Sequence, residues 1–405
     1  MDSAEVNALV HRALDMHREG RSLQALEFIE GVIAKNPEVS KFWNLKGMIL
    51  HETGRFEEAV ACCDRVLAID PRDAVSWNNK GFALEKMVRT ADSLAAHSRA
   101  RELEPNPEED RKFWLDRGGW YRDRGDYTAA LYCFEQALRL APNDVNAWMA
   151  KASVFHYRGL FGEALPCLDR ALALNPENRY AWQNKGSDLK RLGRKKEAMV
   201  CFRRALELAP DDTDIRYEIG DLQIDTGAYA EALQTFERAI ELDPEPFKLW
   251  YMKGGCLYHL ERFEEAACAF GAALERRPDA ETFHMRGLSL FNLERYEEAE
   301  EAFGRAMELN PENALSAFYR GDCRTRLEKF AEAVADFDEA VRLRPDYGRA
   351  WMVRGVAILC LGRTREGLNS IGQAMTVDPE IKEEAEELIK DFIKRTIEVG
   401  GEIIV

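Results

Sequence analysis

Proline recurs along this chain at intervals close to 34 residues, and this regularity restricts the fold more than any other feature. Proline disfavours helical geometry in the residue before it, so each proline of the series predicts the end of a helix. Because the interval hardly changes along 405 residues, the sequence predicts an array of similar units and not one compact core. The series comprises Pro37, Pro71, Pro105, Pro142, Pro176, Pro210, Pro244, Pro278, Pro311, Pro345 and Pro379.

Each unit contains two segments with apolar residues at helical spacing, which we name helix A and helix B. Position 8, in helix A, is always glycine or alanine, and position 20, in helix B, is always small. Two helices cross closely only where neither carries a large side chain, so these positions predict the contact within each helix pair. The units begin at residues 6, 40, 74, 111, 145, 179, 213, 247, 280, 314 and 348.

Aromatic residues and helix caps also recur at fixed positions of the unit. Position 4 is often tryptophan and position 24 often phenylalanine, which predicts aromatic packing around the helix crossing. Asp or Asn shortly after the proline predicts an N-cap for the next helix A. The tryptophans are Trp43, Trp77, Trp114, Trp148, Trp182, Trp250 and Trp351, the phenylalanines Phe134, Phe202, Phe236, Phe270, Phe303 and Phe337, and the caps Asp73, Asp144, Asn178, Asp212 and Asn313.

This pattern resembles the tetratricopeptide repeat family, whose signature W-x2-L-G-x2-Y, followed by A, F, A and P, is matched over residues 6–381. The chain is similar to multi-repeat members of prokaryotic type. The resemblance implies an all-α fold, an α-α superhelix or right-handed solenoid with a C-terminal capping helix. It also implies that helix A lines a concave groove that receives extended peptides or partner helices, and it implies no chemistry.

Departures from the pattern divide the chain. Repeats 1–3 span residues 6–107 and repeats 4–11 span residues 111–381, with a three-residue insertion at 108–110 between them. Repeat 3 is the weakest, with Val88 in place of the usual turn glycine and His97 in place of phenylalanine. The insertion is therefore either a joint between two parts of the chain or only a longer loop.

The end of the chain, residues 382–405, is expected to contain a capping helix and a tail. The segment after Pro379 is charged and amphipathic, with its apolar residues on one side, as suits a terminal helix that keeps the array soluble. The tail ends in an apolar stretch that either docks in a neighbouring groove or packs locally. The apolar residues of the helix are Ile381, Leu388, Phe392 and Ile393, and the tail is Gly400–Val405.

Position 7 of helix A is basic in ten of the eleven repeats, where the family usually has leucine, and only Ile219 interrupts the series. At 100° per residue this position lies nearly opposite positions 2, 5, 9, 12 and 13, which are expected to face the groove. We expect the aliphatic stems to cover the seam between repeats and the charges to meet nearby carboxylates, with an anionic-ligand track as the alternative. The basic residues are Arg12, Lys46, Lys80, Arg117, Lys151, Lys185, Lys253, Arg286, Arg320 and Arg354.

Charge and composition exclude several classes of function. The formal net charge of −16 disfavours nucleic-acid binding, so an RNA-binding helical-repeat protein is only a minor alternative. The sequence starts with a polar, helix-like stretch and contains no long apolar segment, which predicts a cytoplasmic protein without a membrane partner. Nine cysteines without a C-x-x-C pair predict reduced thiols.

No motif for catalysis, a cofactor or a metal is found, so no catalytic residue, cofactor or metal ligand is predicted. His17, His51 and His156 share position 12, but no carboxylate or cysteine completes a recognised ligand pattern. An enzymatic role would have to come from another chain. The alternative to a free-standing scaffold is therefore a regulatory or targeting subunit of a larger enzyme assembly.

The expected groove has two zones, and it lacks the two-carboxylate clamp for acidic C-termini that the family is known for. Repeats 3–6 present polar or basic residues, and repeats 7–10 present aromatic residues of the kind that anchor a ligand. We expect a non-enzymatic protein-interaction scaffold that binds a peptide or partner protein there, although some of the aromatic residues could instead pad the packing. The sequence leaves the partner and the oligomeric state open. The residues are Lys86, Arg122, Gln183, Asn184, Lys190 and Arg191 in the first zone, and Tyr217, Tyr251, Tyr258, Phe291, Phe318 and Tyr319 in the second.

Overall fold

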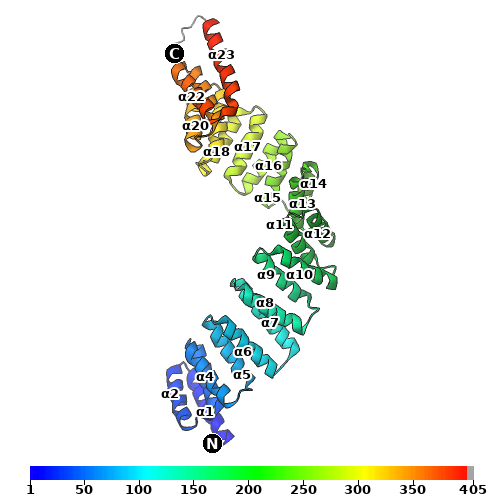
Figure 1. The fold of residues 1–405 in the computed structure, drawn as a ribbon, viewed down its shortest axis with the longest axis vertical. Coiled ribbons are helices and arrows are strands. Elements are labelled where there is room, and N and C mark those ends of the chain that lie inside the picture. The colour runs from blue at the N-terminus through cyan, green and yellow to red at the C-terminus, as the bar shows by residue number, and fades with distance from the viewer. Residues whose placement is uncertain (399–405) are drawn as a thin grey trace. The chain divides into compact units, whose positions relative to one another are not determined.

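A computed structural model describes residues 1–398 of the chain, with side chains as far as Phe392. In these residues it shows twenty-three α-helices, one short 3₁₀ helix and no strand. The helices divide into two compact units, Met1–Arg194 (unit 1) and the part from Lys195 onward (unit 2). In each unit, helices that follow one another in the sequence pack as hairpins (Figure 1). The predicted all-α repeat fold is therefore confirmed.

Helix A and helix B alternate as the proline interval predicts. Unit 1 contains α1 (Ser3–Arg18), α2 (Ser22–Lys35), α3 (Ser40–Glu52), α4 (Phe56–Ile69), α5 (Ala74–Lys86), α6 (Thr90–Leu103), α7 (Pro107–Asp123), α8 (Tyr127–Leu140), α9 (Val145–Tyr157), α10 (Phe161–Leu174) and α11 (Arg179–Arg191). Unit 2 contains α12 (Lys195–Leu208), α13 (Thr213–Asp225), α14 (Tyr229–Leu242), α15 (Phe247–His259), α16 (Phe263–Arg276), α17 (Ala280–Asn292), α18 (Tyr296–Leu309), α19 (Ala314–Arg326), α20 (Phe330–Leu343), α21 (Gly348–Cys360), α22 (Thr364–Val377), the 3₁₀ helix η1 (Pro379–Ile381) and α23 (Lys382–Glu398).

In the hairpins of repeats 4, 7, 8, 9 and 10, the glycine at position 8 of helix A lies against the phenylalanine at position 24 of helix B, so the expected aromatic packing around the helix crossing is confirmed there. A Cβ atom on Gly220 would lie 2.5 Å from the ring of Phe236, and one on Gly287 would lie 2.7 Å from the ring of Phe303. No larger residue fits at these glycines unless the ring moves. The five predicted N-caps are also confirmed, because each side chain accepts a hydrogen bond from the first turn of its helix.

The tryptophans at position 4 make a contact that the sequence did not indicate. In six repeats the indole Nε1 donates a hydrogen bond of 2.7–3.1 Å to the carbonyl of the proline six residues earlier. In repeat 7 Arg216 takes this role, since its Nη2 donates to the carbonyl of Pro210 at 2.6 Å. This recurring bond ties the first turn of helix A to the proline that ends the previous helix B.

The three inserted residues, 108–110, do not form a loop. They lie in the first turn of α7, which begins at Pro107 and is capped by Asn106. Asp110 is buried and accepts a hydrogen bond of 2.9 Å from the backbone N–H of Asn106, while Arg101 from α6 stacks 3.3 Å from the ring centre of Phe113. The expectation of a longer loop here is therefore wrong, because a proline at the first helical position and three acidic residues after it favour a helix N-terminus. That the segment acts as a joint remains a prediction.

Repeat 3 has a polar residue in the centre of its core. His97 takes the place of phenylalanine above Gly81, is fully buried, and has one ring nitrogen, Nε2, without a hydrogen-bond partner. Its Nδ1 lies 3.0 Å from Oδ1 of Asn78. Burial, and then the nearby Arg101 and Arg117, lower the pKa of His97 to about 3. The ring is therefore neutral at physiological pH.

Because the pKa of His97 is lower in the folded chain than in the unfolded chain, we expect acid to destabilise repeat 3. The unfolded state takes up the proton first as the pH falls below about 6.5, so stability decreases from there down to about pH 3. His97→Phe, which restores the residue of six other repeats, should remove about 2 kcal/mol of the loss between pH 7 and pH 5. Urea unfolding of both proteins at the two pH values measures this difference. Equal losses in both proteins would contradict it.

The basic series at position 7 lies along the seam between repeats, as expected. In six repeats its side chain forms an ion pair of 2.5–3.0 Å with an acidic residue at position 25 of the preceding helix B. The pairs are Lys46–Glu30, Lys80–Asp64, Lys151–Glu135, Lys185–Asp169, Lys253–Glu237 and Arg354–Asp338. The series is interrupted at Ile219 because position 25 of the preceding repeat is the basic residue Arg203. A basic side chain at residue 219 would be repelled by Arg203.

The C-terminal helix α23 caps the last repeat. Ile381, Leu388 and Phe392 pack with Leu359 of α21 and with the buried Ala385, as the amphipathic pattern predicts. As far as Asp391, most of the charged residues of α23 are exposed. The side chain of Ile393 and the tail Gly400–Val405 lie outside the described residues.

Candidate functional site

We call the surface formed by positions 2, 5, 6, 9, 12 and 13 of helix A the helix-A face. In unit 1 this face contains a cavity of about 350 Å³ between α3, α5 and α7, which Lys86 lines. A second cavity of about 220 Å³ lies between α9 and α11, and Asn184 lines it. Two of the predicted groove residues therefore border actual hollows.

Of the other predicted residues of the first zone, Arg122 contacts the wall of the second cavity. Arg122 donates from Nη1 to the hydroxyl of Ser153, a residue that lines the cavity, at 3.4 Å. Gln183 and Lys190 are half-buried, and Arg191 is exposed at the end of α11. All six residues of this zone belong to unit 1.

The second cavity contains a buried carboxylate that the sequence analysis missed. Asp188 is 1% exposed at position 10, where other repeats have mostly small or apolar core residues. One of its oxygens, Oδ1, lies 2.5 Å from Nδ1 of His156 on α9. Burial raises the pKa of Asp188, while the hydrogen bond and charge of His156 act in the opposite direction. A charged residue at a core position was the signal that could have revealed this pair.

Three of the six predicted aromatic residues gather on the helix-A face of unit 2. The rings of Phe291 and Tyr319 lie 5.8 Å apart, and Nδ2 of Asn292 donates to the hydroxyl of Tyr258 at 3.4 Å. These three rings, from α15, α17 and α19, are half-buried. They form the aromatic cluster Tyr258–Phe291–Tyr319, which leaves part of each ring accessible.

The other three aromatic residues serve packing to a greater extent. Phe318 is only 4% exposed and packs on Phe337, so its expected place on the groove surface is wrong. Tyr251 lies against Phe270 and donates from its hydroxyl to Oε1 of Glu281 at 2.9 Å. Burial, together with this carboxylate, raises the pKa of Tyr251. Position 5 points at the phenylalanine of the same hairpin, and this is why its rings are drawn inward.

Tyr217 follows the same rule. Its ring centre is 6.1 Å from that of Phe236, and the ammonium group of Lys248 lies 4.6 Å above it. Of the six predicted aromatic residues, only Phe318 is buried, and Tyr319 at position 6 also packs on a phenylalanine of helix B, Phe303, with ring centres 5.6 Å apart. The polar and aromatic zones also lie in different compact units.

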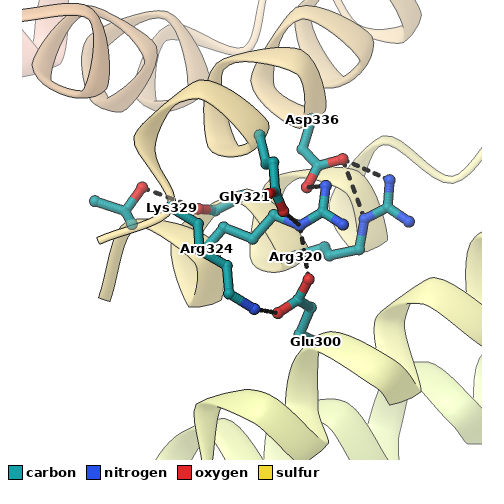
Figure 2. Close-up of polar contacts among 8 residues, drawn as sticks. Glu300, Arg320, Gly321, Arg324, Lys329 and Asp336 are labelled. Carbon is teal, nitrogen blue, oxygen red and sulfur yellow. Dashed lines mark hydrogen bonds and ion pairs between the residues drawn. The ribbon is translucent and has the colours of Figure 1, made fainter. Parts of the chain in front are cut away.

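Unit 2 also contains a network of buried charges (Figure 2). The carboxylate of Asp336 on α20, whose side chain is 3% exposed, accepts hydrogen bonds from Arg320 and Arg324 of α19 at 2.5–3.1 Å. Arg324 and Lys329 also donate to Glu300 of α18, each at 2.8 Å. Burial would raise the pKa of Glu300, but these two hydrogen bonds outweigh it and lower the pKa.

The network replaces the usual ion pair of the seam. Position 25 before Arg320 is Gly304, so the acidic partner found in six other repeats is absent there. Arg320 turns to Asp336, which stands at position 23, where four other repeats have cysteine. Each charge of the network has a partner of the opposite sign, so we assign the network to the stability of the seam and not to a ligand.

Among residues 1–398, no three or more histidine, cysteine or acidic side chains come together in a group that could hold a metal ion. Of the position-12 histidines, His17 lies 2.6 Å from Glu52 and 2.9 Å from Ser22, and His156 pairs with Asp188. The helices of the described part include none that is both long and apolar enough to cross a membrane.

The stacked hairpins, their glycine–phenylalanine contacts and the open helix-A faces define a helical-repeat protein. Two tetratricopeptide repeat models match the sequence, one at residues 40–73 and the other at residues 83–145, 115–178, 149–213, 184–245, 217–281, 284–346 and 325–374. The chain therefore belongs to the tetratricopeptide repeat family. No curated protein matches the sequence.

Several solved structures are similar to this one. YrrB, a repeat protein described as having an unusual peptide-binding site, is 24% identical, with a TM-score of 0.44 over 47% of this chain and 97% of its own. PilF of Pseudomonas aeruginosa is 20% identical, with a TM-score of 0.45 over 54% and 99%. A tetratricopeptide repeat protein of Parabacteroides merdae is 17% identical, with a TM-score of 0.45 over 62% and 99%. At these values the similarities carry no information on function.

Proposed function

We propose that this chain is a non-enzymatic, cytoplasmic scaffold whose helix-A faces bind a peptide or a segment of a partner protein. The observation that supports the proposal best is the aromatic cluster Tyr258–Phe291–Tyr319, since partly exposed aromatic rings on three successive repeats are typical anchors of a protein interface. The cavities of unit 1 lie on the same kind of face. The tetratricopeptide repeat is in general a module of protein interaction.

The acidic character of the chain is consistent with a protein partner and disfavours RNA. A net charge of −16 would repel the phosphate backbone, and the basic residues of the seam are mostly engaged with carboxylates. A regulatory or targeting subunit of an enzyme assembly would use the same faces, so it differs only in the identity of the partner.

Site-specific photo-crosslinking tests the proposal. A photoreactive phenylalanine analogue at Phe291, on the helix-A face, should form crosslinks to a protein in a lysate of the source cells. The same analogue at Glu301, exposed on helix B of the same repeat, is the matched control and should form far fewer. Crosslinks from Glu301 alone, or co-purification of nucleic acid in place of protein, would refute the proposed use of the helix-A face.

Charge reversal on unit 1 provides a second measurement once the partner is identified. Lys190→Glu with Arg191→Glu should slow association with a partner that reaches the first zone, because rim charges act mainly on the association rate. Lys196→Glu with Arg203→Glu, both exposed on helix B, makes the same change of charge outside the helix-A face. If both double variants slow association equally, the association rate depends on the net charge of the chain and not on the helix-A face.

A further inference from the structure

The cavity of about 350 Å³ in unit 1 is bordered by α7, the helix that contains the inserted turn. The insertion lengthens α7, which packs mainly against α8 and α9, while α6 packs against α5 and α8. Trp120 stands at position 10 of α7, where the other repeats have smaller core residues, and it borders the cavity together with Phe82 and Met48. Apolar and aromatic residues thus form part of the wall of this hollow of about 350 Å³, and polar residues such as Asn44 and Asn79 form the rest.

The deepest charge in the wall is the carboxylate of Glu85 on α5. This residue is 8% exposed, and its Oε2 accepts a hydrogen bond of 2.7 Å from Nη1 of Arg117. Its other oxygen, Oε1, is buried and has no hydrogen-bond partner. The hydroxyl of Tyr121 lies close to this carboxylate, and burial, together with the interaction with Glu85, raises the pKa of Tyr121.

An ionised carboxylate only accepts hydrogen bonds, so Oε1 of Glu85 requires a donor. A buried polar atom without a partner is costly, and Oε1 makes no hydrogen bond, although the hydroxyl of Tyr121 lies close to this carboxylate. The Nε2 atom of His51, a second buried atom of the wall without a partner, accepts or donates according to the ring tautomer. The cavity therefore favours a ligand that brings N–H groups.

The aromatic walls are suited to a cation. Arg117 already lies 5.0 Å from the ring centre of Phe82, and Arg124 lies 3.8 Å from that of Trp120. The charge of Arg117 is compensated by Glu85, and the net charge of −16 attracts basic partners over a longer range. The positive charge of Lys86 would repel a cation in the cavity. Lys86 is exposed at the rim, however, and its side chain can turn outward.

We propose that the α3–α5–α7 cavity binds a basic side chain, best an arginine, of the partner polypeptide, with Glu85 as its hydrogen-bond acceptor and Phe82 and Trp120 as its walls. This inference rests on the proposed function and adds the chemistry of one subsite.

Methyl NMR on the full chain tests the subsite with defined probes. The ε-methyl signal of Met48, assigned through Met48→Leu, is followed during titration with N-acetyl-arginine methylamide, its uncharged citrulline analogue and N-acetyl-glutamate methylamide. We expect saturable shifts with the arginine probe and binding weaker by about tenfold or more with the citrulline probe, which keeps the shape and loses the charge.

Three variants separate the contributions of Glu85 and Lys86 to binding of the arginine probe from a general effect of net charge. Glu85→Gln should weaken the arginine probe about tenfold, because it removes the charge of the acceptor, whereas Glu102→Gln, an exposed carboxylate on α6, should leave binding unchanged. Lys86→Met should tighten binding severalfold by removing a like charge. Circular dichroism shows whether each variant is folded. If Glu85→Gln does not fold, the weaker binding of the citrulline probe and the tighter binding of the arginine probe to Lys86→Met still test whether the cavity binds a basic group.

Three results would contradict the proposal that this cavity binds a basic side chain. A preference for the glutamate probe, weaker binding of arginine in Lys86→Met, or no shift of Met48 up to the solubility limit would each exclude a basic ligand here. These results would leave the proposed function standing if Phe291 still crosslinks to a protein. Loss of both the crosslinks and the probe binding would instead refute the scaffold proposal itself.

Discussion

Asp336→Cys is expected to lower the free energy of unfolding by about 3 kcal/mol, although cysteine occupies the same position in four other repeats. The replacement leaves the guanidinium groups of Arg320 and Arg324 facing a cavity without the carboxylate that both of them contact. The value is at the low end of the range for broken buried ion pairs, because the two arginines keep about a fifth of their side chains exposed. Equilibrium urea unfolding followed by circular dichroism measures it.

A second substitution should restore much of this loss. Gly304→Glu places an acidic residue at position 25, next to Arg320, where six other repeats have their seam ion pair; the nearest side-chain atom to a new Cβ there is Nη1 of Arg320 at 3.7 Å. Gly304→Ala is the matched control, since it adds the same helix propensity without the charge. If Gly304→Ala rescues Asp336→Cys as well as Gly304→Glu does, the loss does not arise from the unpaired arginine.

Phe236→Ala is expected to destabilise the chain by about 3 to 5 kcal/mol. The ring is fully buried and fills the space above Gly220, so its removal leaves a cavity that the rigid helix crossing cannot close. Urea unfolding gives the total, and hydrogen exchange should show that the loss of protection is centred on α13 and α14, because each repeat contacts only its neighbours.

Tyr251→Ala is the comparison that tests the division of the aromatic residues. Tyr251 is half-buried and makes one hydrogen bond to an exposed carboxylate, so its removal should cost about 1 to 2 kcal/mol. A loss as large as that of Phe236→Ala would show that Tyr251 is a core residue, and that position 5 has no part in the helix-A face.

Much of the fold could be predicted from local signals in the sequence. The proline series, the Asp and Asn caps, and the pairing of a glycine with a phenylalanine sixteen residues later, as in Gly220 and Phe236, all act within one repeat. The inserted residues 108–110 belong to a helix and not to the longer loop that was one of the two alternatives, because Asn106, Pro107 and the acidic residues after them favour a helix start.

The candidate site could be predicted only in part. Helix periodicity indicates which side a residue is on, and this was sufficient for Tyr258, Phe291 and Tyr319. It does not indicate how far a ring leans into the hairpin, and Phe318 is buried for this reason. Periodicity also does not show that Glu85, at position 12 of the helix-A face, and Asp188, at the core position 10, are both buried.

The sequence by itself determined the order, length and ends of the helices, since capping, helix termination and the hairpin contact depend on residues close together in the chain. Only the tertiary structure decided which partner each charge finds and where the stack leaves a hollow. Arg320 pairs with Asp336 because Gly304 offers no acid, and the cavity at Glu85 lies where three helices from different repeats meet. Such contacts depend on the packing of neighbouring repeats, which no single repeat specifies.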